Sequence, residues 1–566
     1  MGGLGDVVRH FGLKAVYVLV AYGVTRVVDA GKLRQLLRGR RKSAGGERER
    51  PVDARPAPPK PAAPRYRIYH NPRRDFQPSN PGWIREAADL DPADLATDLS
   101  WQCPQLIAFQ AKLAGQAKLR QQPLPATPDA GRGAAGGDGE AGPAPPAHAP
   151  PAAAPPAGPG PGSISFGRQA RKQLFALEPG VTYLNHGSYG AAFRLALDVR
   201  SWYQQQLEAQ PVRFMETVAL KGMVAAVADA ARFVGASHRD VVPTVNATSA
   251  VCAVLRAVPL RRGDWVLTLN TTYSAVQLGL EELQWPASVL GAVQAALSAI
   301  GGGRRLRLAV LDHVVSFPPV VLPVAALTAA CKQVGAQVLV DGAHAIGNVP
   351  RLQVPSIGAD YYTANLHKWG CSPKGAALLW VAPERQEDLL PLTTSHGAGL
   401  GFRAEFLWQG TSDPSAWLAV PAALAVLRWL GPQHVAERNA ALVAEAAAAL
   451  RARWEARAAM GTGPNPAAAG ELGRPPLSLL ALGGGGDWAA GSGAAGMLAV
   501  QLPPLRGYEV SAGSAVRLQR WLREEKDIEV PVVCALGCLW VRISAQVYNE
   551  AADYEELGAA VEALQG

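Results

Sequence analysis

The stretch AQVLVDGAHA, residues 336–345, decides the fold class. It is an almost continuous apolar run that ends in a carboxylate, which is typical of a strand buried on both faces of a parallel sheet. Segments of both kinds alternate around it. KGMVAAVADAARFVG (221–235) and PVAALTAACKQVG (323–335) read as helices, and DWVLTLN (264–270) and RLRLAVLDHV (305–314) read as strands. This alternation predicts an α/β fold with a mostly parallel sheet covered by helices.

The C-terminal part of the 566-residue chain has a different character. The alternating pattern extends over residues 164–413, which we predict to be a large ligand-binding domain. Residues 414–566 begin with a long Ala/Leu helix over 414–455 and continue with a Gly-rich insertion, strands and further helices. They predict a smaller C-terminal α+β domain.

The N-terminal extension has three parts. Residues 1–50 join an apolar run to basic residues, which fits a targeting segment or a basic helix at a membrane surface. Residues 51–122 are a proline-rich stretch followed by a candidate small appended module. Residues 123–163 are a low-complexity linker that cannot bury a core. We therefore predict a disordered extension on an intracellular protein, with a plastid, a mitochondrion or a membrane surface left open as its location.

Charge and cysteine usage exclude two classes of function. The net charge is +9, but much of the excess lies near the N-terminus and no nucleic-acid-binding motif is present, so no nucleic-acid partner is expected. The six cysteines are scattered and form no Cys-x-x-Cys pattern, so no metal site is expected and the thiols are predicted to be reduced.

A lysine stands out in GADYYTANLHKWGCSPKG, residues 358–375. Lys368 is either a surface cation or a reactive amine, because burying an ammonium without a reason is costly. A reactive lysine could form a Schiff base with an aldehyde cofactor. If that cofactor is pyridoxal phosphate, an acid must keep its pyridine nitrogen protonated, and Asp341 is placed for this at a strand end.

A phosphate cradle is also available in the sequence. Asn246, Thr248 and Ser249 directly precede an apolar helical run, and the N-terminus of a helix binds anions. Each signal has an ordinary alternative: Asp341 as a turn former, and the same Asn-Ala-Thr-Ser stretch as a helix cap or a glycosylation acceptor.

The order of the motifs resembles one family. The body, roughly residues 165–566, resembles the class V aminotransferase superfamily of pyridoxal-phosphate enzymes, and most closely its isopenicillin N epimerase-like and cysteine desulfhydrase-like branch. The motifs that carry the resemblance are YLNHGSYGA (183–191), VLVDGAHAIG (338–347), YYTANLHKWGCSPKG (361–375), EFLWQGTSDPSA (405–416) and WVRISAQVYN (540–549). The resemblance implies a fold type I, pyridoxal-phosphate-dependent transferase-like large domain.

The resemblance also implies roles for individual residues. Lys368 is expected to form the Schiff base and to move protons at the substrate α-carbon, Asp341 to pair with the pyridine nitrogen, and His344 to lie beside the ring. Further cofactor contacts are implied for Asn246, Ala247, Thr248, Tyr273, His367, Thr411 and Ser316. Thr411 would act across a homodimer interface. The substrate, a small amino acid, would be bound by Asn185, His186 and Arg542, the last gripping its α-carboxylate.

The reaction is predicted with less detail. A carbon–sulfur lyase acting on a cysteine-like amino acid is our leading interpretation, with an amino-acid epimerase or racemase and a catalytically impaired scaffold as alternatives. Cys538 lies on the strand of Arg542 and Cys371 follows Lys368 closely, which argues against a mobile persulfide-carrying cysteine. Between Tyr273 and the strand at 305–314 the chain is shorter than the resemblance leads us to expect, as if a sheet strand were missing.

Overall fold

The computed structural model describes residues 17–20, 23–29, 82–96, 101–121, 164–261, 264–269, 290–291, 293–294, 297–298, 305–460 and 495–565. Tyr273, the linker at 123–163, most of the N-terminal extension and the Gly-rich insertion lie outside the described residues. The predictions of a linker, of disorder and of a ring-stacking role for Tyr273 therefore remain predictions.

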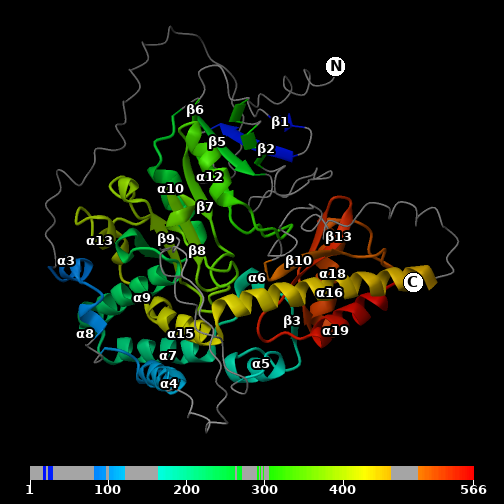
Figure 1. Ribbon diagram of the computed structural model, residues 1–566, viewed down its shortest axis with the longest axis horizontal. Coiled ribbons are helices and arrows are strands. Elements are labelled where there is room, and N and C mark those ends of the chain that lie inside the picture. The colour runs from blue at the N-terminus through cyan, green and yellow to red at the C-terminus, as the bar shows by residue number, and fades with distance from the viewer. Residues whose placement is uncertain are drawn as a thin grey trace, which may run out of the picture.

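Within the described residues, eight strands form one large sheet (Figure 1). They are β1 (Tyr17–Val20), β2 (Gly23–Asp29), β4 (Val241–Thr244), β5 (Asp264–Leu269), β6 (Arg305–Asp312), β7 (Gln337–Asp341), β8 (Tyr361–Asn365) and β9 (Ala377–Val381). Their order across the sheet is β1-β2-β5-β6-β7-β8-β9-β4. Strands β4 to β8 point the same way, and β2 and β9 run against them.

The sheet explains where a site can form. Strand β7 ends in Asp341 and β8 ends at Asn365, just before the loop that carries Lys368. Strands β7 and β8 are parallel neighbours, so these residues meet at the same edge of the sheet. In open α/β sheets, ligands bind at this carboxyl edge.

Helices cover the sheet and bury its apolar side chains. The helices of this part are α5 (Arg168–Leu174), α6 (His186–Tyr189), α7 (Arg194–Ala209), α8 (Pro211–Arg213), α9 (Leu220–Phe233), α10 (Ala247–Ala257), α12 (Val324–Gln333), α13 (Phe402–Leu407), α14 (Ser415–Leu418) and α15 (Val420–Leu430). Helices α14 and α15, which the sequence assigned to the smaller domain, pack into the same core as α7 and α9.

Two N-terminal helices also join this core. Helices α3 (Gly82–Asp89) and α4 (Pro104–Gln121) lie in the stretch, residues 51–122, for which the sequence predicts a small appended module. Instead α3 packs on α9 and α13, and α4 packs on α7 and α15. Ile84, Cys103 and Leu106 are fully or almost fully buried there, because each covers apolar surface of the large domain.

The apolar run near the N-terminus forms strands rather than the interfacial helix we considered. β1 and β2 form a hairpin, and β2 pairs antiparallel with β5 from Thr25–Leu269 to Asp29–Trp265. Their sequences, YVLV and GVTRVVD, are rich in β-branched residues, which favour strands. The hairpin covers the edge of β5 on the side away from β6, and an uncovered strand edge is prone to pair with other chains.

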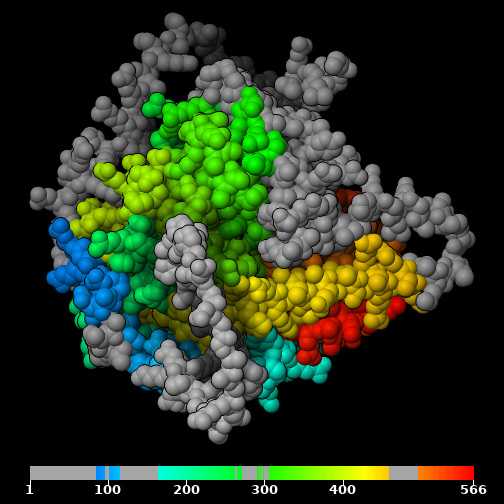
Figure 2. Space-filling view, viewed as in Figure 1, coloured from blue at the N-terminus to red at the C-terminus, as the bar shows by residue number. Residues whose placement is uncertain are grey.

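The C-terminal part builds a second, smaller sheet. It comprises β10 (Met497–Gln501), β12 (Val532–Ala535) and β13 (Cys538–Ser544) in the antiparallel order β10-β13-β12. Helices α16 (Pro432–Met460), α18 (Ala512–Lys526) and α19 (Ala551–Glu562) pack around it. Figure 2 shows α16 (yellow) and α19 (red) side by side on the surface. A short parallel pair, β3 (Thr182–Tyr183) with β11 (Ile528–Glu529), ties this part to the chain before α6.

The predicted continuous helix over 414–455 is wrong, because it is broken between α15 and α16. The chain turns by 71° there. Gly431 takes a φ of +80°, which ends α15, and Pro432 has no N–H to continue the ladder of hydrogen bonds. In the part of the chain that the structure describes, no single helix is long and apolar enough to cross a membrane, although this bent pair reaches the required length and composition together.

Candidate active site

The loop that carries Lys368 is held by a hydrogen bond from His186. His186, at the start of α6, is fully buried. Its Nε2 lies 3.1 Å from the Lys368 carbonyl, to which it donates, and its Nδ1 lies 2.9 Å from the Tyr548 hydroxyl. Burial lowers the pKa of His186 to about 3, so the ring is neutral. This placement makes His186 a support of the loop; it remains only a prediction that the residue lines the substrate side.

Gly190 lets the chain after α6 touch this loop. Its φ is +70°, and a Cβ there would lie 2.5 Å from the His367 carbonyl oxygen and 2.7 Å from the Lys368 Cα. We expect Gly190→Ala to lower the free energy of unfolding by about 2–5 kcal/mol, since it adds a left-handed backbone penalty to a backbone clash. Chemical denaturation measures this loss.

Gly180→Ala is the matched control. Gly180 also has a positive φ, +83°, but none of the described atoms lies within 4 Å of an added Cβ. Only the backbone penalty of about 1–2 kcal/mol should appear. Equal losses in the two variants would contradict the close packing of Gly190 on the loop.

Lys368 faces a histidine whose protonation the fold determines. The Trp369 indole donates to Nδ1 of His344 at 3.3 Å, and His344 Nε2 lies 3.3 Å from Lys368 Nζ. Burial and the nearby positive charge of Lys368 hold the pKa of His344 well below its usual range, so the ring is neutral. An indole only donates, so the ring proton must sit on Nε2, facing the lysine. That N–H can donate to Lys368 only if its amine is uncharged.

The environment of Lys368 makes its amine easier to deprotonate than a solvated lysine. The pKa of Lys368 is lowered to about 8, mainly by burial, with Asp341 opposing the shift and Arg542 adding to it. Asp341 itself is withdrawn from solvent, which raises the pKa of its carboxyl group against the effects of the Ala343 N–H and of Lys368. The Ala343 N–H donates to Asp341 Oδ1 at 2.9 Å and orients the carboxylate.

The residues predicted to hold the phosphate lie at the start of α10. Asn246 caps the helix, since its side chain accepts from the Ser249 N–H at 2.8 Å. The Ala247 N–H donates to Asn365 Oδ1 at 3.0 Å, which anchors the helix start to the end of β8. Thr248 is exposed in the first turn. The helix therefore presents its positive end and a hydroxyl to solvent.

His367 lies in the same loop as Lys368. Its Nδ1–H donates to the Ala376 carbonyl at 2.8 Å. Burial, the largest cause, lowers the pKa of His367 to about 4. In this neutral form Nε2 accepts, so a bound phosphate would have to raise the pKa of the ring before His367 could donate to it.

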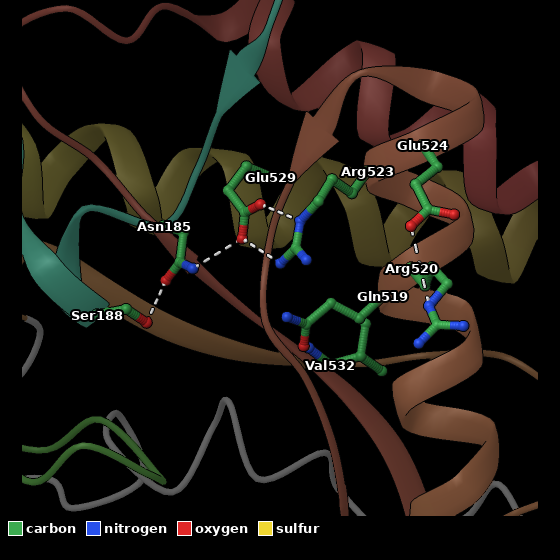
Figure 3. Close-up of polar contacts among 8 residues, drawn as sticks. All are labelled: Asn185, Ser188, Gln519, Arg520, Arg523, Glu524, Glu529 and Val532. Carbon is green, nitrogen blue, oxygen red and sulfur yellow. Dashed lines mark hydrogen bonds and ion pairs between the residues drawn. The ribbon is translucent and has the colours of Figure 1, made fainter.

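Arg542 lies on β13 and is only 7% exposed. Its Nη1 donates to Ser316, at 2.7 Å to the hydroxyl and 3.2 Å to the carbonyl. Its Nη2 donates to Ser188 Oγ at 2.7 Å and to Asn185 Oδ1 at 3.4 Å. Figure 3 shows Asn185 and Ser188 in contact. These acceptors are all neutral, so a carboxylate would make stronger, charge-assisted bonds in their place.

The structure brings some predicted residues together and leaves others apart. Ser316 accepts a hydrogen bond from Arg542, and its predicted contact with the cofactor remains a prediction. Thr411 is exposed in the loop between α13 and α14. Sequence reasoning missed Ser188, Trp369 and Asn365. Ser188 could have been found from its spacing after Asn185 on one turn, whereas the contacts of Trp369 and Asn365 depend on chain segments far apart in sequence.

The chemistry of these donors fits pyridoxal phosphate. A buried lysine of lowered pKa suits the aldehyde, the carboxylate of Asp341 suits the pyridine nitrogen, and the start of α10 suits the phosphate. The six cysteines are free thiols, and burial raises the pKa of Cys371 strongly, so that this thiol stays protonated. Among the described residues, no three His, Cys, Asp or Glu side chains are grouped to hold a metal ion.

Comparisons with known proteins point in the same direction. A sequence model of the family "Aminotransferase class-V" matches residues 194–469. An Oryza sativa subsp. japonica protein whose name assigns it provisionally to the L-cysteine desulfhydrases is 33% identical over 71% of this chain and 87% of its own. An Arabidopsis thaliana relative, similarly named and described as chloroplastic, is 31% identical over 68% and 83%. The isopenicillin N epimerase of Streptomyces clavuligerus is 28% identical over 70% and 98%.

Two solved structures share the fold. The apo cysteine desulfurase of Thermococcus onnurineus NA1 superposes with a TM-score of 0.53 at 18% identity, covering 71% of this chain and 98% of its own. A cystine C–S lyase bound to its reaction product, cysteine persulfide, superposes with a TM-score of 0.52 at 18% identity, covering 69% and 99%. The predicted fold class, a mostly parallel fold type I sheet with a smaller C-terminal α+β part, is confirmed.

Proposed function

Because the chain belongs to the class V aminotransferase family, we propose that it is a pyridoxal-phosphate-dependent carbon–sulfur lyase acting on cysteine or a similar amino acid. The observation that carries the proposal is the facing arrangement of Lys368, Asp341 and His344 at the carboxyl edge of the sheet, with Arg542 close enough to depress the pKa of the lysine. The relatives named L-cysteine desulfhydrase support the choice of substrate.

The residues of this chain would hold the cofactor at three points. Lys368 would carry it in Schiff-base linkage, Asp341 would bind the pyridine nitrogen, and the N-terminus of α10, with Asn246, Ala247, Thr248 and His367, would bind the phosphate. When bound, the cofactor supplies an electron sink that acidifies the substrate α-proton. His344 would lie beside the ring, with its tautomer set by Trp369.

The same residues would carry out the elimination. Arg542 would bind the α-carboxylate, with Asn185 and Ser316 beside it, and so fix the substrate orientation. Lys368 would take the proton from the α-carbon and return it to the sulfur that leaves the β-carbon. The released product, 2-aminoacrylate, would be hydrolysed to pyruvate and ammonia. The reaction balances, since cysteine and water give sulfide, ammonia and pyruvate.

We also propose that the working unit is a homodimer. Residues 408–414 form a loop between α13 and α14, and Thr411 is exposed on it, where a second subunit could be reached. Thr411 would contact the cofactor phosphate of the partner subunit. Light scattering would report the oligomeric state, and a purely monomeric active enzyme would exclude this arrangement.

An organellar location is a further proposal. It is supported by the chloroplastic name of the Arabidopsis relative. A fluorescent fusion seen only in the cytosol would contradict it.

Sulfide and pyruvate release tests the lyase directly. We expect purified protein supplied with pyridoxal phosphate and L-cysteine to form both products in equal amounts. A Cys538→Ser variant should behave alike, because Cys538 lies at the start of β13 and accepts a hydrogen bond from Gln501. Loss of optical activity without sulfide would establish an epimerase instead. A protein that does not bind pyridoxal phosphate would support the third alternative, a catalytically impaired scaffold.

A further inference from the structure

A chain of hydrogen bonds runs from Arg542 away from the site. Arg542 donates to Ser188 Oγ at 2.7 Å, and the Ser188 hydroxyl donates to Asn185 Oδ1 at 2.5 Å. The other end of that amide, Nδ2, donates to Glu529 Oε1 at 3.0 Å (Figure 3). Every bond points the same way, and the chain ends on a carboxylate.

The carboxylate determines which way the amide faces. An ionised carboxylate only accepts hydrogen bonds, so the NH2 group of Asn185 must face Glu529 and its oxygen must face Ser188 and Arg542. The reversed amide would point two donors at Arg542, itself a donor, and would leave the Ser188 hydroxyl without its acceptor. Asn185 is 7% exposed, and an unsatisfied polar group at such a site is costly.

Backbone hydrogen bonds fix the position of Glu529 beside Asn185. Glu529 is the second residue of β11 and pairs in parallel register with Tyr183 of β3, two residues before Asn185. The Leu184 N–H donates to the Glu529 carbonyl at 3.0 Å. The Glu529 side chain is 18% exposed, and Arg523 of α18 donates to both its oxygens, at 2.6 and 3.2 Å.

We propose that Glu529 is a positioning residue for substrate binding: by orienting the Asn185 amide, it holds Arg542 in the geometry that receives the substrate α-carboxylate. This inference rests on the proposed function of Arg542. Glu529 itself touches neither substrate nor cofactor, and it acts from the short β3–β11 pair through Asn185 and Ser188.

The expected effect is on binding rather than on chemistry. Glu529→Ala should raise the KM for L-cysteine about tenfold and change kcat little, since one oriented, charge-assisted bond to the amide is lost. Glu529→Gln should restore most of the affinity, because a glutamine oxygen can still accept from Asn185. A role through negative charge alone would leave Glu529→Gln as impaired as Glu529→Ala.

Glu524→Ala is the matched control on the same face of the structure. Glu524 pairs with Arg520 at 3.9 Å on α18 and is 60% exposed, and Figure 3 shows this pair apart from the chain that reaches Asn185. It should leave KM unchanged. Thermal unfolding of all three variants would show whether the weaker binding of Glu529→Ala is accompanied by a loss of stability.

Two ligands make the outcome independent of turnover. We would titrate L-alanine, which has the α-carboxylate but no sulfur, and cysteamine, which has the sulfur but no carboxylate, and follow the absorbance of the bound cofactor. Glu529→Ala should weaken L-alanine binding about tenfold and leave cysteamine binding unchanged.

Equal L-alanine affinities in Glu529→Ala and Glu524→Ala would overturn the inference, as would an equal loss for both ligands. A wild-type protein that binds L-alanine but releases no sulfide from L-cysteine would overturn the lyase proposal alone. A wild-type protein that binds L-alanine no better than cysteamine would overturn the role of Arg542, and the inference with it.

Discussion

Replacing Lys368 by alanine is expected to abolish covalent capture of pyridoxal phosphate and to lower sulfide release by about 10²–10⁴-fold or more, the range typical of removing a positioned proton-transfer group. In the wild-type protein the amine is buried, has a pKa of about 8 and lies 3.3 Å from His344 Nε2. The measurement is visible absorbance before and after borohydride, which fixes a lysine-linked cofactor irreversibly.

Lys374→Ala is the control for this result. Lys374 lies in the same loop, but its Nζ donates to the Gly190 carbonyl at 2.9 Å. This variant should retain capture, with some loss of stability. If Lys368→Ala still captured the cofactor and Lys374→Ala did not, Lys374 rather than Lys368 would carry it.

The pH dependence of capture provides an independent check. Only the neutral amine attacks an aldehyde, and the pKa of Lys368 is lowered to about 8. The capture rate in the wild-type protein should therefore rise about tenfold per pH unit below pH 8 and level off above it. A rate still rising toward pH 10 would show an ordinary, solvated lysine.

Replacing Arg542 by lysine is expected to lower kcat/KM for L-cysteine by about 10²-fold. Arg542 spans two groups, with Nη1 on Ser316 and Nη2 on Ser188. A lysine ammonium cannot reach both while presenting a planar pair of donors to a carboxylate. Steady-state kinetics with L-cysteine and with cysteamine measure the effect, which should be confined to the substrate with a carboxylate.

Arg520→Lys is its control, because Arg520 lies on α18, is 69% exposed and pairs with Glu524. It should have the wild-type kcat/KM, since exposed ion pairs contribute little. If Arg542→Lys discriminated against cysteamine as strongly as against L-cysteine, Arg542 would act on the fold of the site rather than on the substrate.

Much of the fold was predictable from local patterns. Strand β7 (Gln337–Asp341) and the helix before it were recognisable from the sequence, because burial on both faces produces a long apolar run and Gly335 marks the end of α12. The helix over 414–455 was not, because alanine and leucine continue the helical pattern on both sides of Gly431, and only the backbone geometry there shows the 71° turn.

The N-terminal segment illustrates a second limit. Its apolar composition fits a helix at a membrane surface as well as a strand. The choice depends on a partner more than 200 residues away, since β2 pairs with β5. β-structure is stabilised by such distant pairs, and composition alone does not reveal them.

The sequence by itself determined the class of chemistry, because Lys368, Asp341 and Asn246 each lie in a local motif: a loop, a strand end and a helix cap. Only the tertiary structure decided how these groups are tuned. The tautomer of His344 depends on Trp369, and the orientation of Asn185 depends on Glu529, 344 residues away in the chain. Hydrogen-bond direction and desolvation depend on which groups meet in space, and that is established only when segments distant in the chain have packed together.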